Sequence, residues 1–132
     1  MSFITTQTGQ QFFLNAIVYS DILLLRLYSN DRIPSKTDTI ANYTEVVFSG
    51  YAPKLLTPSE WVIAIDDLTG NYLATFAQQV FSFDDLVTVY GYYITNHAGT
   101  SLLLAERFTT AHVTLPQGQG GNIKITPTIG AQ

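Results

Sequence analysis

Two pairs of adjacent aspartates, Asp66-Asp67 and Asp84-Asp85, are the sharpest polar clusters in the sequence. Calcium requires about six to eight oxygen ligands, from acidic and amide positions around a glycine turn. Residues 66–71 (DDLTGN) supply part of such a set. Paired carboxylates can also hydrolyse glycosides, but aspartate, asparagine and glycine between apolar runs are typical of turns. The sequence therefore predicts two turns and no metal site, with calcium at residues 66–71 as a less favoured interpretation and glycoside hydrolysis below it.

The other residue types that perform chemistry lack the partners they need. Cysteine is absent and His97 and His112 are the only histidines, so a zinc site would need carboxylates from elsewhere. No serine stands in a G-x-S-x-G elbow. The glycine-rich residues 117–121 lack the lysine and the following helix of a phosphate-binding loop. We predict a non-enzymatic protein with no catalytic residue, no cofactor and no metal.

Charged residues interrupt two otherwise apolar runs, at Arg26 in LLLRLY and at Glu106-Arg107 in LLLAERF. A charge buried in a sheet must be paired. We expect Arg26 and Glu106 to form a structural ion pair that fixes the register of the strands.

Aromatic residues are abundant, with 8 tyrosines, 8 phenylalanines and 1 tryptophan. Most must lie in the core, and Trp61, at the start of an apolar run, is expected there. Exposed tyrosines serve protein interfaces, because they offer a large contact area with a polar tip. We predict that the following residues contact a partner: Phe3, Ile4, Tyr43, Tyr51, Tyr90, Tyr92 and His97.

The composition narrows the class of protein. Hydrophobic residues make up 46% of the chain and charged residues only 12%, with a net charge of −4. So little charge repels neighbouring molecules poorly and suits a protein that works in an assembly. The six lysines and arginines are scattered along the chain, which argues against nucleic-acid binding. No apolar run approaches the ~20 residues of a membrane span, and the first residues lack the basic start and long apolar run of a signal peptide.

The hydrophobic periodicity predicts one helix and about eight strands. Thr8 and Gln11 match a capping box, and Phe12, Phe13, Ala16 and Ile17 then recur at helical spacing. After residue 22 the period becomes two, with turn signals every ~8–12 residues. In the run at residues 72–83 the buried parity changes, which predicts a bulge or bend near residues 77–79. Residues 86–108 predict two adjoining strands joined by a turn at residues 97–99.

These patterns favour a mainly β fold: an antiparallel β-sandwich, jelly-roll-like if its connections swap sheets, with one short N-terminal helix. We expect an N-terminal arm and short helix at residues 1–21 and a single sandwich domain at residues 22–132.

Three segments resemble a known group of proteins: LRLYSNDRIP with its TDT tail, YTEVVFSGYAPKLL with Trp61 downstream, and VYGYYITNHAGTSLLLAERF followed by ITPTI. Together, over about residues 22–129, they are similar to small structural proteins of tailed bacteriophages, including cyanophages, of the capsid cement or decoration type. The resemblance implies a sandwich on the outer surface of the virion capsid, made in the bacterial host cytoplasm. Its partner would be the major capsid protein, whose subunits it bridges as a homo-oligomer (trimer or dimer).

A second function stays open at this point. Receptor-binding or carbohydrate-binding modules of phage tails are also β-sandwiches, and tyrosines can stack on sugar rings. An exposed Trp61 beside tyrosines and a calcium loop would favour that function. A buried Trp61 and an apolar base that carries the arm would favour cement.

Overall fold

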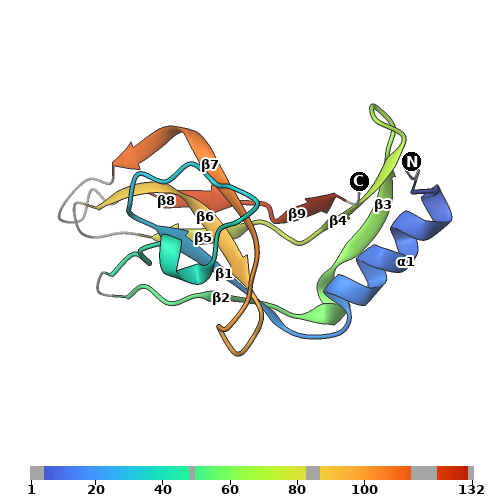
Figure 1. Ribbon diagram of the computed structural model, residues 1–132, viewed down its shortest axis with the longest axis horizontal. Helices are drawn as coiled ribbons and strands as arrows, with labels where there is room; N and C mark the ends of the chain where they lie inside the picture. The colour runs from blue at the N-terminus through green and yellow to red at the C-terminus, as the bar shows by residue number, and fades with distance from the viewer. Residues whose placement is uncertain (1–4, 48–49, 83–86, 114–121, 131–132) are drawn as a thin grey trace.

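The computed structural model describes residues 5–47, 50–82, 87–113 and 122–130. The fold is mainly β and antiparallel, with one α-helix near the N-terminus, as predicted (Figure 1). The helix is α1 (Gln7–Val18), and the strands are β1 (Leu23–Tyr28), β2 (Lys54–Leu56), β3 (Val62–Asp66), β4 (Asn71–Thr75), β5 (Gln79–Ser82), β6 (Thr88–Thr95), β7 (Leu102–Val113), β8 (Asn122–Ile125) and β9 (Thr128–Gly130). Short 3-10 turns lie at Ile40–Asn42 and Pro58–Glu60.

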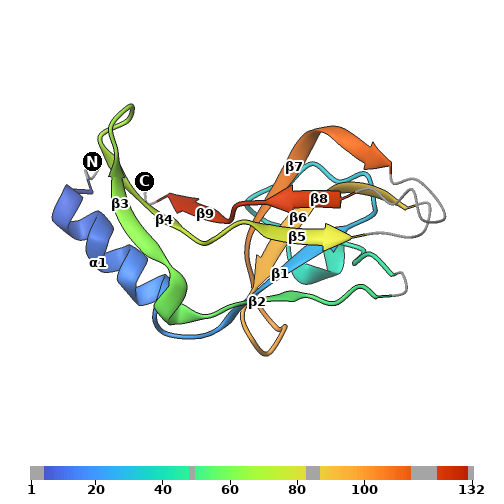
Figure 2. The ribbon, with the colours of Figure 1, turned by 180° about the vertical axis from the view of Figure 1, so that it is seen from behind.

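Two layers form the body of the molecule. One is a four-stranded sheet in the order β2-β1-β6-β7, and β5 and β8 pair with each other in the facing layer (Figures 1 and 2). Apolar side chains at alternate positions fill the space between them, namely those of Leu25, Leu27, Ile94, Phe81, Ile123 and Ile125. The chain leaves the four-stranded sheet between β2 and β3, returns to it between β5 and β6, and leaves it again between β7 and β8. The arrangement is sandwich-like.

The predicted irregularity near residues 77–79 is confirmed. β4 and β5 form one long strand interrupted at residues 76–78, opposite the interruption of β8 and β9 at residues 126–127. Thr75 pairs with Thr128 and Gln79 with Ile125, so three residues on one side oppose two on the other. The extra residue changes the parity of the strand, and Phe76 and Phe81 are therefore both buried.

The other part of this long strand pair, β4 with β9, belongs to a small sheet at one end of the molecule. β3, β4 and β9 pair in that order, and α1 packs against β4 and β3 (Figure 1). Leu14 and Val18 of the helix belong to the same hydrophobic cluster as the sandwich core. The helix and the strands thus share one core.

The helix differs from its prediction in two respects. Thr6, not Thr8, is the N-cap, and its hydroxyl accepts a hydrogen bond of 3.1 Å from the Gly9 amide. The buried positions are Gln10, Leu14 and Val18, whereas the predicted apolar face is exposed. Gln10 accounts for which face of the helix is buried, because its side-chain amide bonds both the Asn71 side chain and the Tyr72 backbone in β4.

The hairpin of β6 and β7 agrees with its prediction. The strands are joined by a turn that contains His97 and Gly99, and Gly99 has a φ of 71° that favours glycine. The register shifts at two places, between Val89 and Gly91 and between Ile94 and Thr95, and at the second Leu103 is the extra residue on β7. β7 has no partner strand on its other side among the described residues.

Candidate binding surfaces

The outer face of the four-stranded sheet is covered by a loop at residues 29–44. The loop is closed at its base, because the Ser29 amide bonds the Thr44 carbonyl at 2.8 Å and the Val46 amide bonds the Leu27 carbonyl at 3.0 Å. Compact loops with adjoining ends are frequently functional. This loop is therefore the first region to examine for a site.

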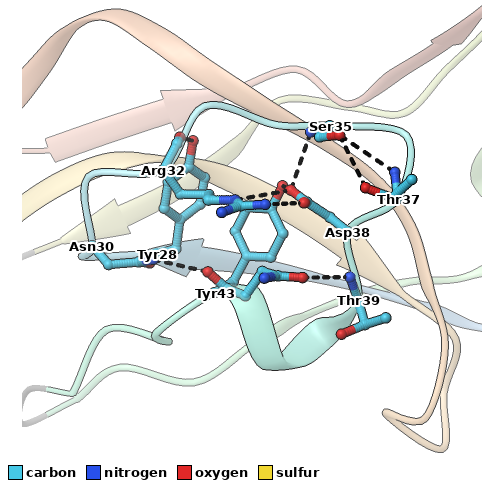
Figure 3. Close-up of polar contacts among 9 residues, drawn as sticks. Tyr28, Asn30, Arg32, Ser35, Thr37, Asp38, Thr39 and Tyr43 are labelled. Carbon is cyan, nitrogen blue, oxygen red and sulfur yellow. Dashed lines mark hydrogen bonds and ion pairs between the residues drawn. The ribbon is translucent and has the colours of Figure 1, made fainter.

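A carboxylate organises the loop from inside (Figure 3). Asp38, whose side chain is 1% exposed, accepts hydrogen bonds from two nitrogens of the Arg32 guanidinium. It also accepts from the Tyr43 hydroxyl at 2.7 Å and from the Ser35 amide at 3.1 Å. The hydrogen bonds from Arg32 and Tyr43 stabilise the ionised form and hold the pKa of Asp38 well below its ordinary value. The carboxylate is fully engaged in fixing the loop, which argues against a role as an acid or base.

Three tyrosines pack beneath the loop on the outer face of the sheet. The Tyr43 ring stacks on Tyr93 with centroids 5.2 Å apart, and Tyr28 meets Tyr43 edge-on at 4.9 Å. Burial raises the pKa of Tyr93 to about 12 and also raises the pKa of Tyr43, which donates to Asp38. The Tyr28 ring crosses Gly91, where an added Cβ would lie 2.6 Å from the Tyr28 hydroxyl. The cluster gives the outer face a second, small hydrophobic core.

The predicted ion pair of Arg26 with Glu106 is wrong. Arg26 bonds Glu45 at 2.9 Å and the Thr95 hydroxyl at 3.2 Å. The strand register separates the predicted partners: Arg26 lies opposite Tyr93, which lies opposite Ala105, whereas Glu106 lies opposite Tyr92. Arg26 and Glu106 therefore point to opposite faces of the sheet, and Glu106 accepts a hydrogen bond of 3.1 Å from the Tyr92 hydroxyl instead.

A groove of about 680 Å³ lies between this loop and β7. Pro34, Ser35, Lys36, Asp38 and Tyr43 line one side, and residues 102–105 of β7 line the other. Figure 3 shows the β7 ribbon passing beside the segment from Ser35 to Thr39. The Asp38 network therefore also fixes one wall of the groove. The sequence analysis did not predict the Asp38 network, although the opposite charges of Arg32 and Asp38 on either side of Pro34 were a usable signal.

Three of the tyrosines predicted to contact a partner are engaged within the chain instead. Tyr43 and Tyr92 are buried within the chain, which contradicts the prediction for both. Tyr51 is half-buried and stacks on Phe81, while its hydroxyl bonds the Leu27 amide and Glu45. Tyrosines satisfy both needs of an interior position, because the ring packs and the hydroxyl finds a partner.

The remaining predicted contacts are placed differently. His97 is exposed in the β6–β7 turn, and Tyr90 is half-buried under the Arg107 guanidinium, 5.2 Å from the ring centroid. Phe3 and Ile4 lie outside the described residues, as do Asp84 and Asp85. His112 lies in β7.

An apolar surface that was not predicted as a contact lies at the α1 end. Phe12 and Phe13 are 73% and 55% exposed, with their rings 6.3 Å apart, and Ile17 is exposed on the next turn of the helix. Leu68 is exposed in the adjoining β3–β4 turn. Gln7 ties the start of the helix to that turn through a hydrogen bond to the Gly70 carbonyl. We call Phe12, Phe13, Ile17 and Leu68 the apolar end.

The turn at residues 66–71 uses its oxygens internally. Asp66 accepts from the Leu68 amide and the Thr69 hydroxyl, each at 3.2 Å, and the Asn71 side chain accepts from Gln10. Gly70 has a φ of 73°, as this turn requires. Among the described residues, no three His, Cys, Asp or Glu side chains are grouped as a metal site would need.

Trp61 is 3% exposed and packs edge-on against Phe76 at 5.2 Å, as the sequence predicted for a core residue. Its indole N–H finds no hydrogen-bond acceptor among the described residues. Tyr19 at the end of α1 bonds the Trp61 carbonyl at 3.0 Å, so Trp61 also anchors the helix.

No family model, no curated protein and no solved structure matches the chain. Within the described ranges, no helix combines the length and apolar character that crossing a bilayer requires.

Proposed function

We propose that this chain is a non-enzymatic structural protein of a phage virion, of the capsid cement or decoration type. It would bind the outer surface of the head as a homo-oligomer (trimer or dimer) and bridge neighbouring subunits of the major capsid protein, stabilising the shell. The observation that carries the proposal is the apolar end. It agrees with what the resemblance of residues 22–129 implies.

The apolar end has the character of a docking surface. Two exposed phenylalanines and a leucine in one region are costly to leave in water, and burying each contributes about 1.5–3 kcal/mol. The helix that carries Phe12, Phe13 and Ile17 has no charged residue of its own, so a partner can cover this face of it without stranding ions there. Weak contacts of this size become strong together when many copies act on one lattice.

The tail-module alternative has less support. Its sugar-stacking surface would need an exposed Trp61, and Trp61 lies in the core against Phe76. The oxygens of the Asp66 turn bond within the turn and to α1. Both observations favour the cement proposal.

The test is a binding experiment with expanded capsids that lack the decoration protein. Purified protein is mixed with them at increasing concentration, and bound copies are counted by quantitative gel analysis and electron microscopy. We expect saturation at the number of local twofold or threefold positions. No binding, or binding without saturation, would refute the proposal.

A matched pair of variants tests the surface. Phe12→Gln with Phe13→Gln should weaken binding at least tenfold, since each ring removes over 1.4 kcal/mol of burial, the equivalent of about tenfold. Val47→Gln with Leu55→Gln is the control, because both side chains are exposed on the sandwich body. Equal loss in both variants would show that the apolar end is not the docking surface.

A further inference from the structure

We propose that the groove beside β7 binds an extended peptide segment of another protein, which adds to the sheet as a strand. The segment would carry apolar side chains at alternate positions and a carboxylate that meets Lys36. This inference does not rest on the capsid function, because it concerns a different surface and follows from β7 and the loop beside it.

The backbone of β7 supplies the first argument. β7 is the last strand of its sheet, and no described residue donates to or accepts from the outer edge of residues 102–105. A strand in this position presents unpaired amide and carbonyl groups at every second residue. An extended backbone is the ligand that satisfies such groups, and strand addition to an open edge is a known mode of peptide recognition.

The side chains beside this edge supply the second argument. Leu102 and Leu104 are half-buried and Leu103, the extra residue of the register slip, is 45% exposed. An apolar edge left open is an association site. Four residues of strand span about 13 Å, so the groove accepts a short segment rather than a whole sheet.

The opposite wall of the groove is held in place before any ligand arrives. Asp38 binds Arg32, Tyr43 and the Ser35 amide, and Pro34 fixes its own φ in this wall. Binding therefore orders few residues of the protein, which lowers the entropy that association costs.

Charge distinguishes the two possible occupants of the groove, a peptide segment of another protein and a second copy of this chain. Lys36 is exposed on the wall and forms no ion pair among the described residues, while Asp38 is neutralised by Arg32. A carboxylate on the peptide complements Lys36. A second copy joined β7 to β7 about a twofold axis would add a second Lys36 to the interface and no free carboxylate from this wall, because a twofold interface uses the same patch on both sides. Like charges disfavour that dimer.

The experiment uses the full chain labelled with ¹⁵N and a synthetic octapeptide that has glutamate at each end and alternating valine and threonine between. We expect saturable shifts of the amide signals of residues 102–105. The same peptide with N-methylated backbone amides should bind about tenfold more weakly or not at all, because it lacks the donors that pair with β7. No shift at millimolar peptide, equal binding of the N-methylated peptide, or shifts centred on another edge would overturn the proposal.

A charge exchange tests the role of Lys36 without disturbing the fold. Lys36→Glu should weaken the glutamate peptide about fivefold, the scale of an exposed ion pair, and should strengthen a peptide with lysine at each end. Lys124→Glu is the control, with the same charge change on β8. Equal effects of both variants would overturn the assignment of the carboxylate. Analytical ultracentrifugation tests whether the groove binds a second copy. A dimer that Ser35→Trp abolishes would assign the groove to a second copy and also overturn the proposal.

Discussion

The guanidinium of Arg26 lies 2.9 Å from Glu45, and the other oxygen of that carboxylate accepts a hydrogen bond of 2.6 Å from the Tyr51 hydroxyl. Tyr51 also accepts from the Leu27 amide on the side of β1 where β2 has ended, whereas Leu27 pairs with Tyr92 of β6 on the other side. Glu45 and Tyr51 thus complete the edge of β1 and close the base of the loop at residues 29–44.

Removing the Glu45 carboxylate should lower the free energy of unfolding more than removing the Glu106 carboxylate. We expect Glu45→Ala to lower the free energy of unfolding by about 1–3 kcal/mol, since Arg26 is largely covered and loses its partner. A double-mutant cycle of Arg26→Met with Glu45→Gln should give a coupling of about 1 kcal/mol, measured by urea unfolding. The cycle of Arg26→Met with Glu106→Gln is the control and should give a coupling below about 0.5 kcal/mol. Similar coupling in both cycles would contradict the register.

Gly91 should not tolerate a side chain. A Cβ there would collide with the Glu106 carbonyl oxygen and with the Tyr28 ring. We expect Gly91→Ala to lower the free energy of unfolding by about 1–3 kcal/mol, the usual cost of overpacking, as measured by urea unfolding. Tyr28→Phe should not rescue it, because the backbone oxygen stays in place. Rescue by Tyr28→Phe would show that the hydroxyl alone made the conflict.

Acid should destabilise the protein through Asp38. The folded-state pKa of Asp38 is depressed, so the unfolded chain binds the proton more readily. The stability that the carboxylate contributes is complete above the unfolded-state pKa of about 3.9 and is lost as the pH falls below it. Urea midpoints should be flat from pH 7 to about 5 and fall below about pH 4. Asp38→Asn should lower the midpoint at pH 7 and flatten the acid limb, and Asp67→Asn, in the exposed turn, should leave both unchanged. An acid limb equally steep in Asp38→Asn would assign the effect to other carboxylates.

Regular elements could be predicted because their patterns report burial directly. The change of parity between Phe76 and Phe81 was sufficient to place the bulge, since every strand side chain faces one side or the other. The helix was predicted from Phe12, Phe13 and Ile17, but the chain buries Gln10 with Leu14 and Val18. Gln10 on that face donates to the Asn71 side chain and accepts from the Tyr72 amide in β4, and a pattern count cannot register such bonds.

The candidate site was harder to predict, because its contacts join a loop to a sheet. Arg26 was correctly expected to need a partner, but Glu45 forms only an isolated bridge with Tyr28, and its pairing with Arg26 depends on how the loop closes. Tyr43 was interpreted as a surface residue, because nothing in the neighbouring sequence indicates that Asp38 accepts a hydrogen bond from its hydroxyl. Side chains in irregular segments are placed by tertiary contacts that spacing does not encode.

Trp61 offers the sharpest test of the core. Its indole N–H is buried without an acceptor among the described residues, and an unsatisfied buried donor costs about 1–3 kcal/mol. Trp61→Phe removes that donor but leaves a cavity beside Phe76, which costs a similar amount. The two effects oppose each other, so the free energy of unfolding should change by less than about 1 kcal/mol. Trp61→Ala should lower it by about 3–5 kcal/mol, and urea unfolding monitored by far-ultraviolet circular dichroism measures both. If Trp61→Phe proved as damaging as Trp61→Ala, the indole N–H would have to be engaged in a hydrogen bond in solution.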